Sequence, residues 1–248
     1  MKPTGNTILV TGGTSGIGLA LAQSLAAAGN TVIIAGRRTD RLSAAVAATP
    51  GLIGLPLDMA DKAGIAAFAA RVIDDHPALN VVINNAGIMR AEDLTRGPGY
   101  LDDAEAMITT NLLGPIRLIA ALTTHLQAQT TATIINVTSG LAFVPLAITP
   151  TYNATKAALH SYSQSLRHQL RGTSVEVLEL APPAVQTDLM PGSATNPNAM
   201  PLAEYIAEVM ALLRAGAGPE ILVERVKFLA NAEREGRYDA VFGMLNGA

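Results

Sequence analysis

The sequence predicts an α/β fold with a doubly wound parallel sheet of six or seven strands and helices on both faces. Short β-branched apolar runs alternate with longer alanine-rich stretches, and several of the runs are continuously apolar. Continuously apolar strands are typical of parallel sheets that are covered on both sides. Repeated strand–helix–strand units imply right-handed crossovers, which give such a sheet helices on each face.

The elements follow one another in a regular order. We expect strands over Thr7–Val10, Thr31–Ala35, Leu52–Leu55, Val81–Ile83, Thr133–Val137 and Ser174–Leu180. We expect helices over Gly16–Ala28, Thr39–Ala48, Asp61–Asp75, Asp103–Gln127 and Thr151–Leu170. Glu92–Asp103 and the proline-rich Pro182–Pro201 are expected to be irregular, and loops of that length are often functional. No linker or internal repeat divides the chain, so residues 1–248 are predicted to form a single domain.

Composition excludes several function classes. The 248 residues carry a formal net charge of −3 with no basic tract, which argues against a nucleic-acid partner. There are no cysteines, so disulfides, thiolate nucleophiles and sulfur-ligated metals are excluded. The four histidines show no ligand spacing with acids, and we expect no metal site. Mean hydropathy is +0.31, but the longest apolar run, Ile65–Ala70, is too short to span a bilayer. We therefore expect a cytoplasmic protein without a membrane partner.

A glycine-rich turn lies between the first expected strand and the first expected helix. It contains Gly12, Gly13, Gly16 and Gly18 in the sequence Thr-Gly-Gly-Thr-Ser-Gly-Ile-Gly. Glycines at this place let a pyrophosphate approach the backbone, and the N–H groups of the helix N-terminus face the phosphates. The turn therefore predicts a dinucleotide site, although its spacing is not the general G-x-G-x-x-G.

The end of the second strand indicates which nicotinamide cofactor binds. An NAD site has an acid there to hold the ribose 2′-hydroxyl, whereas this chain has Arg37 and Arg38. Guanidinium groups pair with a 2′-phosphate, and Arg37 comes first after the strand. We expect NADP(H) to be preferred over NAD(H).

Three polar side chains indicate proton transfer. Tyr152 and Lys156 are four residues apart on an expected helix and therefore share a face. A nearby ammonium favours the phenolate and would lower the tyrosine pKa from about 10. Ser139 follows an expected strand at the carboxyl edge, where parallel sheets bind ligands.

These motifs together resemble the classical short-chain dehydrogenase/reductase (SDR) family, which has a Rossmann-type fold. The resemblance covers residues 7–188 and rests on the Thr-Gly-x-x-x-Gly-x-Gly turn, Asn84-Asn85-Ala86-Gly87, Asn111, Ser139 and Tyr152-x-x-x-Lys156, in the family's order. It implies an NAD(P)-dependent oxidoreductase that acts on carbonyl or alcohol groups, usually as a homodimer or homotetramer.

The resemblance also implies a role for each matching residue. Tyr152 would protonate the carbonyl oxygen, Ser139 would hold that oxygen, Lys156 would bind the nicotinamide ribose, and Asn111 would anchor a water that links Lys156 to solvent. Asp58 would meet the adenine amino group. The full set of expected cofactor contacts is Gly12, Thr14, Ser15, Gly16, Ile17, Gly18, Arg37, Arg38, Asp58, Met59, Asn85, Ala86, Gly87, Tyr152, Lys156, Val185 and Thr187.

Two features depart from the family pattern. Pro182-Pro183 replaces the usual Pro-Gly, so the backbone beside the nicotinamide must run differently. The C-terminal segment, about 219–248, lacks the usual Asp-Gly-Gly, and Ile221–Val223 could be a seventh strand or part of a helix.

The residues expected near the nicotinamide are apolar, which predicts a largely hydrophobic ketone or secondary alcohol as the substrate. These residues are Met89, Leu141, Phe143, Ile148, Pro183 and Met190. Two alternatives stay open: a non-catalytic NADP(H)-binding sensor or scaffold on the same fold, and a sugar-nucleotide epimerase or dehydratase. The sensor has no need of the complete Tyr–Lys–Ser–Asn set, and the epimerase needs more chain than follows Asp188.

Overall fold

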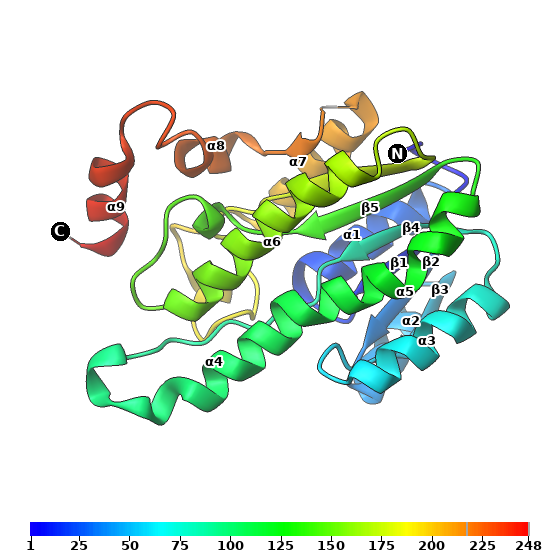
Figure 1. Cartoon of the computed structure of the whole chain (residues 1–248), viewed down its shortest axis with the longest axis horizontal. Helices are drawn as coiled ribbons and strands as arrows, with labels where there is room; N and C mark the ends of the chain where they lie inside the picture. The colour runs from blue at the N-terminus through cyan, green and yellow to red at the C-terminus, as the bar shows by residue number, and fades with distance from the viewer. Residues whose placement is uncertain (217, 248) are drawn as a thin grey trace.

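A computed structural model describes residues 1–216 and 218–247 and shows one parallel sheet of seven strands. The strands are β1 (Thr7–Thr11), β2 (Thr31–Gly36), β3 (Leu52–Pro56), β4 (Leu79–Asn84), β5 (Ala132–Val137), β6 (Val175–Leu180) and β7 (Glu220–Ile221). Their order is β3-β2-β1-β4-β5-β6-β7, and every pairing is parallel (Figure 1). The chain reverses its direction of travel across the sheet between β1 and β4, which is where such sheets bind ligands. The predicted fold class is confirmed.

Helices cover both faces of the sheet. One face carries α1 (Gly16–Ala27), α2 (Thr39–Ala48) and α7 (Leu202–Ala215), and the other carries α3 (Lys62–Asp75), α5 (Gly114–Ala128) and α6 (Pro150–Gln169). The remaining helices are α4 (Leu101–Ile108), α8 (Glu224–Ala230) and α9 (Tyr238–Asn246). In Figure 1, α8 and α9 lie beyond the carboxyl end of β5, beside the start of α6.

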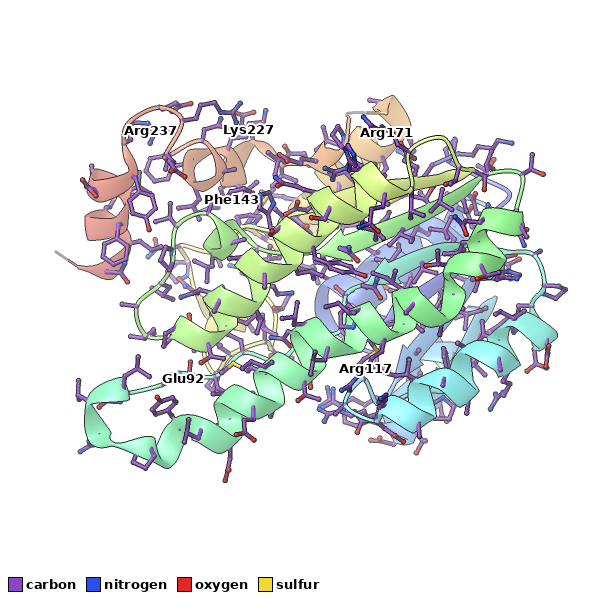
Figure 2. All side chains as sticks on the ribbon, viewed as in Figure 1. Glu92, Arg117, Phe143, Arg171, Lys227 and Arg237 are labelled. Carbon is purple, nitrogen blue, oxygen red and sulfur yellow. The ribbon has the colours of Figure 1, made fainter. Side chains whose placement is uncertain are left out.

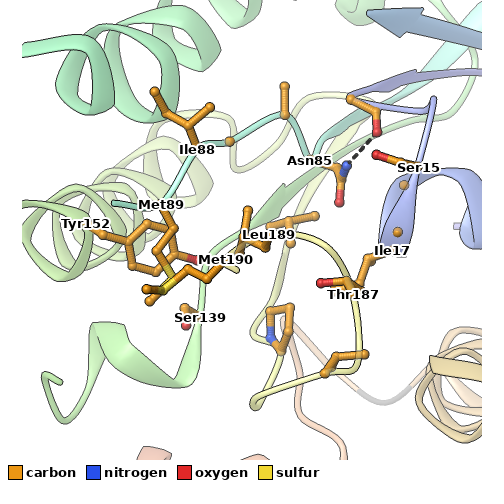
Figure 3. Close-up of a pocket in the computed structure, with 18 of the residues that line it drawn as sticks. Ser15, Ile17, Asn85, Ile88, Met89, Ser139, Tyr152, Thr187, Leu189 and Met190 are labelled. Atoms are coloured by element: carbon orange, nitrogen blue, oxygen red, sulfur yellow. Dashed lines mark hydrogen bonds between the residues drawn. The ribbon is translucent and has the colours of Figure 1, made fainter. Parts of the chain in front are cut away.

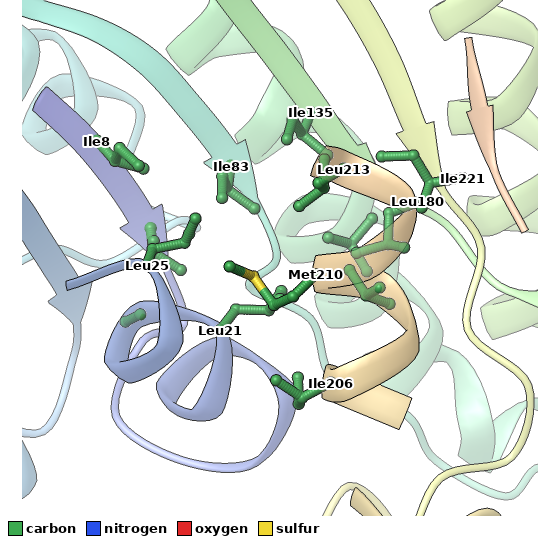
Figure 4. Packing of buried hydrophobic residues seen from close by; sticks show 14 of the residues in the cluster. Ile8, Leu21, Leu25, Ile83, Ile135, Leu180, Ile206, Met210, Leu213 and Ile221 are labelled. Atoms are coloured by element: carbon green, nitrogen blue, oxygen red, sulfur yellow. The ribbon is translucent and has the colours of Figure 1, made fainter. Parts of the chain in front are cut away.

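The two faces have separate apolar cores. On the α1/α7 face, Leu21, Leu25 and Met210 pack against strand residues such as Ile83 and Leu180 (Figure 4). On the opposite face, the apolar side chains of α3 and α5 pack beneath β1, β4 and β5. Burying one Leu or Ile side chain contributes about 1.5–3 kcal/mol. The large share of apolar residues in the sequence is therefore explained by two buried cores, one on each face of the sheet.

Several boundaries differ from those expected. The predicted helix Asp103–Gln127 consists of α4, a π-helical turn over Thr109–Leu113 (η3), and α5. The expected loop Glu92–Asp103 contains short 3₁₀ turns at Leu94–Arg96 and Pro98–Tyr100, and the loop gives way to α4 at Leu101. The seventh strand is only two residues long, at Glu220–Ile221.

One helical stretch, Pro98–Ala128, is long and apolar enough to cross a membrane by length and composition alone. Its apolar side chains Leu118, Leu122 and Leu126 are buried in the core beneath the sheet. We therefore ascribe the apolar composition of this stretch to packing against the strands.

Candidate active site

The carboxyl edge of the sheet opens into a cavity of about 860 Å³. All seventeen expected cofactor contacts line it, and Ser139 lines it too. Figure 3 shows Ser15, Ile17 and Thr187 at one end and Tyr152, Met89 and Met190 at the other. The structure thus brings the glycine turn together with Ser139, Tyr152 and Lys156 in a single cavity.

The glycine turn forms a cradle that side chains would fill. A Cβ on Gly12 would lie 2.8 Å from the Cα of Ala86, and one on Gly18 would lie 2.4 Å from the carbonyl oxygen of Gly12. Gly12 and Gly16 have positive φ values of 66° and 53°, which L side chains rarely adopt. The first turn of α1 has no acidic residue to compete for its N–H groups. These features fit a bound pyrophosphate.

The cationic side of the cavity lies at the end of β2. Arg37 and Arg38 are exposed and line the cavity, and neither forms an ion pair with another residue that the structure describes. Asp58 follows β3 on the same edge, and its carboxylate accepts a hydrogen bond from the backbone N–H of Ala60. Two free guanidinium groups at this place fit the 2′-phosphate of NADP(H).

The floor of the cavity is the segment after β4. The hydroxyl of Thr11 accepts hydrogen bonds from the backbone N–H groups of Asn85 and Ala86, both at 3.1 Å. The side-chain amide of Asn85 donates to the carbonyl oxygen of Thr11 at 3.0 Å. These contacts fix the end of β4 against the glycine turn.

Asn111 holds the next part of this floor from the π-helical turn. Its Oδ1 accepts from the backbone N–H of Ile88 and its Nδ2 donates to the carbonyl oxygen of Ile88, both at 2.8 Å. Nδ2 also lies 3.3 Å from the hydroxyl of Thr155 on α6. Asn111 is fully buried and does not line the cavity, so its direct contacts are to the loop and to α6.

Tyr152 and Lys156 lie on buried positions of α6, and Ser139 follows β5. The ammonium of Lys156 donates to the carbonyl oxygen of Val137 at 2.8 Å and lies 5.6 Å from the centre of the Tyr152 ring. The Oγ of Ser139 accepts from the backbone N–H of Leu141. The end of β5 and the helix α6 are therefore in contact where Ser139, Tyr152 and Lys156 lie.

The pKa values of the two ionisable groups are set by burial. Burial raises the pKa of Tyr152 to about 12, and a hydrogen bond from the Ser139 side chain opposes this rise. Burial also lowers the pKa of Lys156 to about 8. The expectation of a tyrosine pKa below 10 is wrong for this structure, because desolvation of the phenolate dominates. At neutral pH the phenol keeps its proton.

A buried carboxylate that the sequence did not reveal anchors the start of α6. Glu92 accepts hydrogen bonds from the backbone N–H and the hydroxyl of Thr151, at 2.8 and 2.7 Å. Glu92 lies 59 residues earlier in the chain, on the loop after β4 (Figure 2). No local pattern relates these two positions, so only the fold brings them together.

The apolar end of the cavity contains some of the expected substrate residues. Met89, Leu141, Pro183 and Met190 line it. Phe143 and Ile148 lie outside it: the 3₁₀ turn Gly140–Ala142 directs Phe143 to the ring of His160, 4.9 Å away between centroids, and Ile148 is 54% exposed. The prediction for these two residues is wrong, because the Phe143 ring packs against His160 and the Ile148 side chain is exposed to solvent.

The C-terminal segment supplies residues that the sequence did not reveal. Leu229 at the end of α8 and Leu245 in α9 line the cavity. The side chain of Asn246 accepts from the backbone N–H of Ala147 and donates to the carbonyl oxygen of Pro145. These bonds hold α9 against the loop that precedes α6, so α9 forms a roof over the apolar end.

Among the described residues, His160, Glu179 and Glu220 have ligand-type atoms within 4.8 Å of one another. Within residues 1–216 and 218–247, this cluster is the one group of three such side chains that could bind a metal, and it lies outside the cavity lining.

The sequence profile of the family described as short chain dehydrogenase matches residues 6–198. The chain belongs to this family. It is an NAD(P)-dependent short-chain oxidoreductase.

Individual relatives extend the likeness to the whole chain. The chain is 44% identical to the uncharacterized oxidoreductase DltE of Bacillus subtilis (strain 168) over 250 residues, which cover 99% of this chain and 98% of that protein. Its fold is similar to a short chain dehydrogenase from Burkholderia cenocepacia J2315 in complex with NADP, with a TM-score of 0.85, 25% identity and 99% of both chains covered. It is also similar to a short-chain dehydrogenase from Sphingobium yanoikuyae in complex with NADPH, with a TM-score of 0.80, 25% identity and 95% of both chains covered.

Proposed function

We propose that the protein is an NADPH-dependent carbonyl reductase that also works in reverse as an alcohol dehydrogenase. The observation that carries this proposal is a protonated, buried phenol, Tyr152, beside Ser139 and Lys156 in one apolar cavity with the glycine cradle. The substrate is a small molecule, a largely hydrophobic ketone or secondary alcohol. We further propose that the protein is cytoplasmic and that it forms a homodimer or homotetramer. Size-exclusion chromatography with light scattering would test the oligomeric state.

The preference for NADP(H) rests on Arg37 and Arg38. They are free to pair with a 2′-phosphate, and β2 ends at Gly36 without an acid that would hold a 2′-hydroxyl. Two similar folds are complexes with NADP or NADPH, which supports the same cofactor here. Replacing Arg37 with Ala should weaken NADPH binding far more than NADH binding. Equal losses for the two cofactors would refute this preference.

Tyr152, Ser139 and Lys156 each have a different role in the proposed reaction. When bound, NADPH supplies the hydride for the carbonyl carbon. Tyr152 donates its phenolic proton to the carbonyl oxygen, so that a ketone becomes a secondary alcohol. Ser139 positions that oxygen by a hydrogen bond, and the ammonium of Lys156 stabilises the phenolate that remains and binds the ribose hydroxyls.

The lining of the substrate end supports an apolar substrate. Met89, Leu141 and Met190 surround this end, and Leu229 and Leu245 close it from above. Arg90 also lines the cavity, but its guanidinium donates to the carbonyl oxygen of Met89 and lies 3.9 Å from the carboxylate of Asp103. Efficient turnover of short anionic keto acids alone would contradict this substrate class.

A panel of ketones assayed by NADPH consumption tests the function, with Tyr152→Phe and Lys156→Ala as controls. We expect the largest kcat/KM values for aliphatic ketones and loss of turnover in Tyr152→Phe. Activity that survives in Tyr152→Phe would refute the mechanism. Tight NADPH binding without turnover of any ketone would favour the sensor.

A further inference from the structure

A carboxylate is completely buried behind the active site. Glu179, on β6, has no exposed side-chain surface. Its Oε1 accepts a hydrogen bond of 2.6 Å from the hydroxyl of Thr138, and its two oxygens lie 2.9 and 2.7 Å from Nδ1 of His160. A buried carboxylate is costly unless it is paired and hydrogen-bonded, and here both of its oxygens are engaged.

The partners of Glu179 connect the two elements that carry the reactive groups. Thr138 directly precedes Ser139 at the end of β5. His160 lies on α6, four residues after Lys156 and eight after Tyr152, and so on the same side of the helix. Neither Glu179 nor His160 lines the cavity, so neither can touch the cofactor or the substrate.

We propose that His160 and Glu179 act as a positioning pair that holds Ser139 at the correct place relative to Tyr152. This inference rests on the proposed function, because Ser139 and Tyr152 must contact the same carbonyl oxygen. Lys156 already joins α6 to the carbonyl oxygen of Val137. A hydrogen bond of 2.9 Å from Asn136 of β5 to Ser163 joins the helix to the strand further along. The His160–Glu179–Thr138 chain lies between these two connections and is the one that reaches the residue directly before Ser139.

The charge on His160 strengthens this connection. The hydrogen bond to Glu179 raises the pKa of His160 above its usual 6.5, and partial burial opposes this rise. The negative charges of Glu179 and Glu220 add to the rise, whereas the positive charge of Arg167 opposes it. The ring of Phe143 packs against the imidazole edge-to-face. A charged imidazole donates a stronger hydrogen bond to a carboxylate than a neutral one does. As the pH rises through the raised pKa, the pair loses this charge assistance.

Five variants measured with the best ketone test the pair. In His160→Leu we expect kcat to fall about 10- to 100-fold, the range caused by a small misplacement of reacting groups. The KM for the ketone and the Kd for NADPH should change less than about twofold, because no binding contact is removed. His160→Asn keeps an N–H donor close to the position of Nδ1 and should recover most of kcat. His168→Leu, the same change at an exposed position of α6, is the matched control.

The isosteric change Thr138→Val removes only the hydroxyl, so it tests the pair if His160→Leu fails to fold. We expect it to lower kcat in the same way, and we expect Thr138→Ser to restore most of the loss. An unchanged kcat in Thr138→Val, or equal losses in His160→Asn and His160→Leu, would overturn the proposal.

NMR titration of the four histidines in the protein without cofactor gives a readout that does not depend on turnover. The His160 resonance, assigned with His160→Asn, should titrate above 6.5 in the wild type and return toward 6.5 in Glu179→Gln. A His160 pKa near 6.5 in the wild type would overturn the proposed positioning pair. A stoichiometric shift of this resonance on addition of Zn²⁺ would also overturn it, because the shift would assign His160, Glu179 and Glu220 to a metal site. If no ketone is reduced while the titration behaves as expected, the proposed function fails and the geometry of the pair stands.

Discussion

Asn111 is fully buried and uses both ends of its side-chain amide to bind the backbone of Ile88. Ile88 belongs to the loop that forms the floor of the cavity, directly after Gly87. The π-helical turn over Thr109–Leu113 places Asn111 opposite this loop. The change Asn111→Leu keeps a similar volume but removes both hydrogen bonds to Ile88 and the longer one to the hydroxyl of Thr155. It leaves the N–H and the carbonyl of Ile88 without their partner.

The loss in the free energy of unfolding comes from the N–H and the carbonyl of Ile88, which lose their hydrogen-bond partner. Each costs about 1–3 kcal/mol when it is left unpaired in the interior. Because Ile88 is itself only partly buried, we expect the lower end of this range, about 2–3 kcal/mol in total. A domain of ordinary stability, about 5–15 kcal/mol, would remain folded. The free loop should also weaken NADPH binding, since Gly87 lines the cavity.

Urea unfolding followed by circular dichroism measures the change in the free energy of unfolding, and calorimetry measures NADPH affinity. Thr110→Val, an isosteric change one residue earlier on the same turn, is the control and should cost less than about 1 kcal/mol. A loss below about 1 kcal/mol in Asn111→Leu, or unchanged NADPH binding, would refute the assigned role.

Changes at Gly18, Lys156 and Tyr205 have expected outcomes, and Gly99→Ala serves as a control. In Gly18→Ala the new Cβ would lie 2.4 Å from the carbonyl oxygen of Gly12, so unfolding measurements should show a loss of about 1–3 kcal/mol and calorimetry should show weaker NADPH binding. Gly99→Ala, with no atom within 4 Å of its Cβ, should change neither. The wild-type kcat/KM for ketone reduction should fall as the pH rises through about 8, where the Lys156 ammonium loses its proton, and a pH–rate profile of Lys156→Arg should lack this fall. Tyr205→Phe removes a buried hydroxyl that has no hydrogen-bond partner in the described chain, so thermal unfolding should show a gain of about 1 kcal/mol, whereas a loss would indicate a bound water.

Local patterns predicted the elements that carry the cofactor site. The apolar runs gave the places of six strands because a strand covered on both faces needs apolar residues at consecutive positions. The glycine turn and the tyrosine–lysine spacing are short-range patterns, so each could be interpreted without knowing the rest of the fold.

Features that depend on distant parts of the chain were not predictable. Glu179 and His160 lie 19 residues apart on different elements, and no periodicity pairs them. The raised pKa of Tyr152 depends on how many atoms surround the phenol, which spacing does not reveal. The π-helical turn inserts an extra residue into a helix without changing its apolar pattern strongly, so the pattern predicts one long helix.

The roof of the substrate end comes from a part of the chain that the family profile does not reach. Residues 6–198 contain the glycine turn, both arginines and the reactive groups, whereas Leu229 and Leu245 come later. Replacing the C-terminal helices would therefore change the lining of the apolar end while the glycine turn and the Tyr152 phenol stay the same. For engineering, grafting α8 and α9 from another member of the family offers a way to alter selectivity, provided that the graft keeps an amide at position 246 to bind the 145–147 loop.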